Sequence, residues 1–336
     1  MAFSVTSLQL VNQVRRRMRH DDVTAIGQLR DLATLDAINR AMREVLLGSV
    51  WESDKRHTQM SLKARLEGVT IAGSVNSEFI LVAGTSGSTT IDTASDVYGD
   101  FITRVLPNGS AAYGNTALRA LKATTPASNS SVMTLPFQLA DAVSVTAGEL
   151  FYSEYILADT VRSILSVTHQ DESLSLEQVG ATVEFSELYP RQQVEYGAPK
   201  SVSVGGLDVP TYNAAGDAPS PGLRMIVWPP PDDEYVLDME YLYRHPELVT
   251  ATDTLDGVPD VVVDSIVDMA TADMQQNYDR NTNEGRALRR DSMEKLDRAY
   301  KVQGAQVTER AVIGNWDGSA GRVRRRDSLI GGRTIG

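Results

Sequence analysis

The sequence predicts an α+β fold: a helical bundle built from the N- and C-terminal helices, a large inserted antiparallel β-domain, and an extended C-terminal arm. Apolar residues recur with helical spacing near both ends, and they tend to alternate in the middle, where Thr, Ser, Val and Gly become frequent. The last residues carry many glycines and no sustained period. We therefore expect the bundle in residues 1–57 and 256–304, the β-domain in 58–255, and the arm in 305–336.

Two helices are predicted before the β-domain. In the first, Thr6 followed by Gln9 three residues later fits a capping box, and four apolar side chains follow helical spacing: Leu8, Val11, Val14 and Met18. The arginines at positions 15, 16, 17 and 19 are expected on its solvent-exposed face. The second helix runs from about residue 31 to 47 and ends at Gly48.

The middle of the chain is predicted to contain short antiparallel strands. The turn sequence Pro107-Asn108-Gly109 directly follows an apolar run, which is a good hairpin signal. Stretches rich in Ser, Thr, Ala and Gly, at 84–96 and 123–131, are expected to be loops. Candidate strands lie at 78–83, 101–106, 152–157, 163–168, 223–228 and 235–243.

Helical spacing returns at Pro259, a residue that a first helical turn tolerates. One helix is expected from there to about residue 278, and a last helix over about 284–302, ended by Gly304. The helices at the two chain ends are expected to pack as one bundle, because each has an apolar face to bury. The arm that follows cannot bury much alone, so we expect it to become ordered on a partner.

Composition limits the class of protein. The chain has 336 residues, a formal net charge of −12 and no cysteine. The charge argues against a nucleic-acid coat, and the lack of cysteine excludes disulfides, zinc–thiolate sites and thiol catalysis. Residues 67–254 hold 8 Lys+Arg against 24 Asp+Glu, a net of −16, whereas residues 318–336 hold 5 Arg against 1 Asp, a net of +4. Such asymmetry often marks interaction segments.

The search for catalytic and cofactor-binding motifs finds none. The sequence has no P-loop, no H-E-x-x-H and no G-x-S-x-G, and its four histidines are far apart. The acidic clusters at 232–234 and 253–256 could hold a hard cation, but turn and capping roles are favoured. No apolar run approaches the roughly 20 residues that span a bilayer, and the N-terminus does not resemble a signal peptide. We therefore expect no enzymatic activity, no cofactor and no membrane contact.

Several segments share a recognisable pattern of apolar, Pro and Asp positions. They are Asp36-Ala-Ile-Asn-Arg-Ala-Met-Arg-Glu44, Tyr155-Ile-Leu-Ala-Asp-Thr-Val-Arg-Ser-Ile-Leu-Ser-Val167, Ile226-Val-Trp-Pro-Pro-Pro-Asp232, residues 235–243, Pro246-Glu-Leu248, and residues 253–259 with the helix after them. In this pattern the chain resembles the head-to-tail adaptor, or connector, proteins of tailed bacteriophages. The likeness covers about residues 4–50 and 150–304, whereas residues 58–150 do not align and Ala158 stands where Pro is common.

The resemblance implies a structural protein of the virion neck, assembled in the host cytoplasm. It implies a homo-oligomeric ring, a dodecamer because the portal is twelve-fold, which binds the portal protein and continues the DNA channel toward a tail or nozzle protein. DNA would pass without sequence-specific binding. The arm would hold the portal through apolar anchors and an arginine cluster: Val312, Ile313, Trp316, Arg322, Arg324, Arg325, Arg326, Leu329 and Ile330.

Three other interpretations are left open. The arginine cluster, taken alone, fits a solvated basic tail equally well. Another neck or tail ring, such as a nozzle or a tail terminator, could have a similar composition, although terminal helices flanking a β-domain favour the adaptor. A carbohydrate-binding or hydrolase β-module is disfavoured because Trp occurs only at 51, 228 and 316, too few for aromatic platforms.

Overall fold

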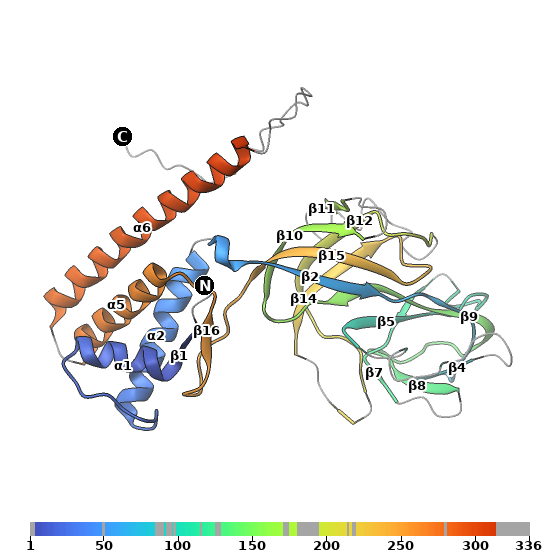
Figure 1. The fold of residues 1–336 in the computed structure, drawn as a ribbon. Helices are drawn as coiled ribbons and strands as arrows, with labels where there is room; N and C mark the ends of the chain where they lie inside the picture. The colour runs from blue at the N-terminus through green and yellow to red at the C-terminus, as the bar shows by residue number, and fades with distance from the viewer. Residues whose placement is uncertain are drawn as a thin grey trace, which may run out of the picture.

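The computed structural model describes residues 4–48, 51–84, 91, 96, 99–114, 116–124, 129–170, 175–179, 195–213, 215–216, 220–278 and 281–313, with only the backbone at 47, 48, 52 and 303–313. The fold is α+β, as the sequence predicts. The helices lie at one end of the molecule and most strands at the other (Figure 1). We call residues 4–48 and 244–313 the helical part, and residues 55–243 the β-part.

The helices come from both ends of the chain. In the described part of the chain, two long helices precede the β-part and two follow it: α1 (Ser7–Arg17), α2 (Leu29–Gly48), α5 (Asp260–Asn277) and α6 (Thr282–Ile313). The predicted capping box begins α1, because Thr6 Oγ1 accepts from Gln9 N at 3.2 Å and Gln9 Oε1 accepts from Thr6 N at 2.9 Å. Two backbone donors that a helix start leaves without a partner are thereby satisfied.

All four helices contribute to one apolar core. Its members include Leu10, Ile38, Ile266 and Leu296, one from each helix and none more than 8% exposed. Trp51, from the segment that leads into the β-part, belongs to the same core. Residues near the beginning of the chain therefore pack against residues near its end.

The described strands form three sheets. The smallest pairs β1 (Ser4–Thr6) with β16 (Thr254–Asp256), and the next has the order β10 (Val161–His169), β15 (Tyr235–Tyr243), β2 (Lys55–Leu62). The eleven-stranded sheet follows the path β11 (Glu177–Val179), β12 (Ser201–Asp208), β14 (Gly222–Trp228), β9 (Val143–Ile156), β3 (Leu66–Gly73), β4 (Phe79–Gly84), β8 (Ser130–Thr134), β7 (Lys122–Ala123), β13 (Tyr212–Asn213). Beside this path, β5 (Phe101–Leu106) pairs with β9 and with β6 (Leu118–Arg119).

A second apolar core joins the three-stranded sheet to the large sheet. It contains Leu237 and Met239 of β15 together with Tyr152 and Tyr155 of β9. The Tyr155 hydroxyl donates to Tyr152 O and accepts from Lys63 N, both at 3.0 Å. Burial raises the pKa of Tyr155, so its hydroxyl stays protonated and links β9 to the end of β2.

The last helix is longer than the sequence predicts. We expect it to end at Gly304, but α6 continues to Ile313, so residues 305–313 of the predicted arm are helical and not extended. A single glycine costs a helix only about 1 kcal/mol relative to Ala, and Ala305 directly after it is a strong helix former. The rest of the predicted arm, residues 314–336, lies outside the described part of the chain.

One strand is also longer than expected. The strand predicted at 152–157 is the second half of β9, which begins at Val143 and has 14 residues. Its first half is rich in Ser, Thr, Ala and Gly, residue types that we associate with loops. Pairing with β3 along this half, from Val143 to Leu150, overrides that local preference.

Candidate functional site

The chain passes between the helical part and the β-part twice, before β2 and after β15. The two passages meet where His245 Nε2 lies 3.1 Å from Asp54 Oδ1, and neither side chain is more than 5% exposed. They are adjacent in the sheet as well, because Lys55 at the start of β2 pairs with Leu242 near the end of β15. The β-part is thus attached through two segments that lie side by side. We call this region the joint.

Asn39 of α2 fixes the second passage. Its Nδ2 donates to Leu248 O at 2.9 Å, and Leu248 N donates to Asn39 Oδ1 at 3.0 Å, although the two residues are 209 positions apart. Asn39 is only 9% exposed, so water competes little for these bonds. Two of the segments on which the adaptor resemblance depends, 36–44 and 246–248, therefore meet in space.

The end of α2 is held from two further sides. Arg162 of β10 donates from Nη1 to Leu46 O at 3.1 Å. Trp51 donates from Nε1 to Val45 O at 3.3 Å, and its ring meets the Tyr300 ring of α6 edge to face, with the ring centroids 6.0 Å apart. These contacts fix the β-part and α6 relative to the same helix end.

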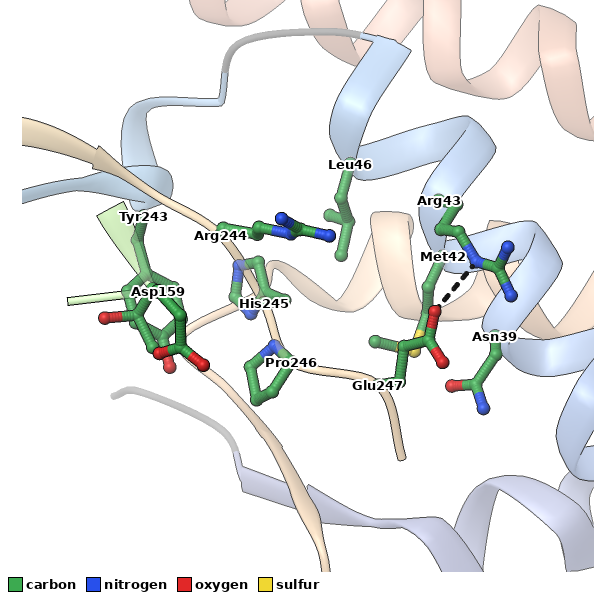
Figure 2. A pocket seen from close by; sticks show the side chains of 11 residues that line it. Asn39, Met42, Arg43, Leu46, Asp159, Tyr243, Arg244, His245, Pro246 and Glu247 are labelled. Atoms are coloured by element: carbon green, nitrogen blue, oxygen red, sulfur yellow. Dashed lines mark ion pairs between the residues drawn. The ribbon is translucent and has the colours of Figure 1, made fainter. Parts of the chain in front are cut away.

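A cleft of about 260 Å³ lies at the joint, between α2 and the segment that follows β15 (Figure 2). Arg43 and Glu247 form an ion pair of 3.3 Å across one side of it. Tyr243 and Asp159 lie toward the other side, and His245 is engaged with Asp54. The cleft has charged side chains of both signs on its walls. Among the described residues, no three His, Asp or Glu side chains gather as a metal site would require.

The sequence predicts that the arginines of α1 face solvent; Arg16 and Arg17 are exposed, but Arg15 and Arg17 also form ion pairs with carboxylates that are buried. Arg15 Nη1 lies 2.7 Å from Asp31 Oδ1, and the Asp31 side chain is 1% exposed. Arg17 forms an ion pair with Asp268 of α5, and Lys295 of α6 lies 3.4 Å from the same carboxylate. Pairs built on a buried carboxylate fix how elements are arranged more than they add stability. These charges specify the arrangement of the four helices.

Several basic side chains of the β-part form internal ion pairs, among them Arg104, Arg119 and Arg224. Arg104 and Arg224 contact Glu154 at 3.0 and 3.5 Å, and Arg119 donates to both oxygens of Asp208 at 2.9 and 2.6 Å. Burial alone would raise the pKa of Asp208, but hydrogen bonds from Arg119 and a backbone amide outweigh it, so this pKa lies below its usual value. These arginines are not available to neutralise the other acidic side chains of the segment.

The predicted arm residues lie at and beyond the end of α6. Val312 and Ile313 are its last two residues, and only their backbone is described. The other predicted anchors lie outside the described residues: Trp316, Arg322, Arg324, Arg325, Arg326, Leu329 and Ile330. Their role stays a prediction. The structure adds the starting point of the arm, which is the free end of a long helix (Figure 1).

The contacts described so far hold the fold together: two apolar cores, a joint fixed by hydrogen bonds, and charged side chains paired with one another. The class of protein comes from the comparison with sequence families. A family model described as SU10 adaptor protein matches residues 88–324, and the chain belongs to this family of phage head-to-tail adaptors. No curated protein matches the chain.

The family match covers a different range from the likeness over residues 4–50 and 150–304. It begins at residue 88, so it includes much of the segment 58–150 that we could not align, and it continues through α6 to residue 324. It does not include α1 or α2, where we saw a likeness over residues 4–50. Membership implies a structural role in a bacteriophage and a position at the virion neck. No helix of the described residues has both the length and the apolar character needed to cross a membrane.

Proposed function

We propose that the chain is one subunit of a dodecameric ring that binds the portal protein through its C-terminal end and continues the DNA channel toward the tail. The observation that carries this proposal is the length of α6. It has 32 residues, whereas α5 beside it has 18. At about 1.5 Å per residue, α6 is about 20 Å longer than α5. It therefore projects past the other helices (Figure 1).

Exposed apolar side chains on α6 support a contact outside this chain. Tyr300 and Val302, just before the projecting end, are 40% and 59% exposed. A helical segment of about 12 residues is marginally stable in water unless it packs against something. The anchors that follow, such as Trp316 and Arg322, would extend this contact, and many copies in one ring would make weak single contacts strong together.

The negative charge of the chain supports a channel through which DNA passes without being held. Residues 67–254 have a net charge of −16, and three of their eight basic side chains are held in internal ion pairs. An acidic surface toward the channel would repel phosphates, so that the duplex slides without sequence-specific contacts. The opposite face of the ring would bind a tail or nozzle protein.

The proposal is tested with purified portal protein and two forms of the chain. The full chain is expected to form rings with a central hole on the portal, seen by electron microscopy. A chain that ends at Ile313 keeps α6 and should remain folded, but we expect its portal affinity to fall at least about a hundredfold. As a control, Leu207→Ser alters an exposed apolar residue of β12 and should leave binding unchanged.

Other outcomes would contradict the proposal. Unchanged portal binding by the shortened chain would show that residues 314–336 do not bind the portal. Rings that bind only a tail protein would identify a nozzle or a tail terminator. A chain that forms no ring and binds glycans would identify a carbohydrate-binding module.

A further inference from the structure

A groove of about 530 Å³ follows the free edge of β2. One edge of β2 pairs with β15, and its other edge pairs with no strand in the described part of the chain. The lining of the groove includes every residue from 58 to 63. Successive side chains of a strand point to opposite faces, so a groove that touches six consecutive residues reaches the edge of the strand as well as one of its faces.

The floor of this groove is apolar. It is lined by Met60 and Leu62 of β2, by Met239 of β15, and by Tyr155 and Val161 near the end of β9 and the start of β10. The groove therefore lies between the two sheets where their shared core opens to the surface. An extended segment placed here could pair with β2 and bury alternate apolar side chains, which is how strand addition works.

The rim of the groove carries negative charge. Asp100 and Glu234 are exposed residues of the lining, and neither has an ion-pair partner among the described residues. Lys63, the basic residue of the lining, is paired with Asp96 at 3.4 Å. A segment that fits the groove should therefore be extended, apolar at intervals, and basic.

The chain's own C-terminal segment has this chemistry. Residues 314–336 contain 5 Arg against 2 Asp, a net of +3, and include apolar residues such as Val323, Leu329 and Ile330. They begin at the C-terminal end of α6, which points toward the half of the molecule that holds the β-part (Figure 1). Fully extended, these 23 residues span up to about 75 Å.

We propose that residues 314–336 occupy the β2 groove of their own copy, adding a strand to the three-stranded sheet. The tether makes the effective concentration of the segment high, so even a weak fit keeps the groove filled. If the proposed function holds, this position stores the arm until a portal competes for it. That consequence rests on the proposed function, whereas occupation of the groove does not.

The first test uses a fluorescent peptide of residues 314–336 and the chain that ends at Ile313, without portal protein. Saturable binding is expected. The double variant Asp100→Lys/Glu234→Lys should weaken it at least about tenfold, because two rim charges are reversed. The matched control Glu78→Lys/Asp141→Lys makes the same charge change at exposed residues outside the lining and should bind like the wild type. No saturable binding, or equal losses in both double variants, would overturn the proposal.

The second test examines the full chain directly. Amide hydrogen exchange at residues 58–63 should be at least about tenfold slower in the full chain than in the chain that ends at Ile313, at every protein concentration. Equal exchange in the two chains would overturn the proposal, and so would protection that appears only at high concentration, since the segment would then come from another copy. Because no portal is present, this result is independent of the portal-binding test.

Discussion

Replacing Asn39 by alanine should destabilise the protein by about 2–4 kcal/mol. The amide makes two hydrogen bonds with the backbone of Leu248, at 2.9 and 3.0 Å, and Asn39 is 9% exposed. Without it, a buried N–H and a buried C=O lose their partners, and each such loss costs about 1–3 kcal/mol. Water entering the space left by the side chain recovers part of that cost.

Two variants on the same helix sharpen this test. Asn39→Asp keeps the acceptor for Leu248 N but turns a carboxylate oxygen toward Leu248 O, so at neutral pH its loss should be at least as large as that of Asn39→Ala. Arg43→Ala removes the ion pair with Glu247, whose side chains are 52% and 58% exposed, and should cost below about 1 kcal/mol. Urea unfolding followed by circular dichroism measures the midpoints of all three variants. The dependence of the unfolding free energy on urea concentration should stay that of the wild type. Equal midpoints for Asn39→Ala and Arg43→Ala would refute the reasoning.

Two further predictions concern the β-part. In Gly222→Ala the new Cβ would lie 1.9 Å from the backbone atom Leu157 O. The free energy of unfolding, measured by thermal unfolding, should therefore fall by about 3 kcal/mol. In the control Gly27→Ala the new Cβ meets open space, so this free energy should change little. The lowered pKa of Asp208 stabilises the fold above about pH 4, and this contribution is lost as the pH falls through the folded-state pKa. The free energies of unfolding of wild type and Asp208→Asn, measured with urea, should therefore converge as the pH falls. A difference that does not depend on pH would contradict this.

Local sequence signals predicted the helices well where the signal is periodic. The stripe of apolar residues and the Thr6–Gln9 capping box place α1 correctly. The end of α6 was predicted wrongly, because Gly304 lowers helix stability only slightly and the residues after it favour a helix. Strand β9 was predicted only in part, since its first half has the composition of a loop and is held by pairing with β3.

The joint could not be predicted from local patterns. The partners Asn39 and Leu248 are 209 positions apart, and no periodicity or motif links a polar side chain to a distant backbone group. The ion pair of Arg17 with Asp268 was missed for the same reason, because an arginine on a helix is by default expected to face water. The adaptor resemblance was nevertheless visible, since it depends on short patterns of Pro, Asp and apolar residues.

The side-by-side attachment of the β-part makes it an interchangeable module. Lys55 and Leu242 are paired neighbours, so the inserted domain leaves and returns to the helices within a single strand spacing. A short turn from Asp54 to Arg244 could close that gap, and a grafted domain would have to replace the bond from Arg162 to the end of α2. Recombination at these two positions would let a lineage exchange everything that the module displays while it keeps the same helical scaffold.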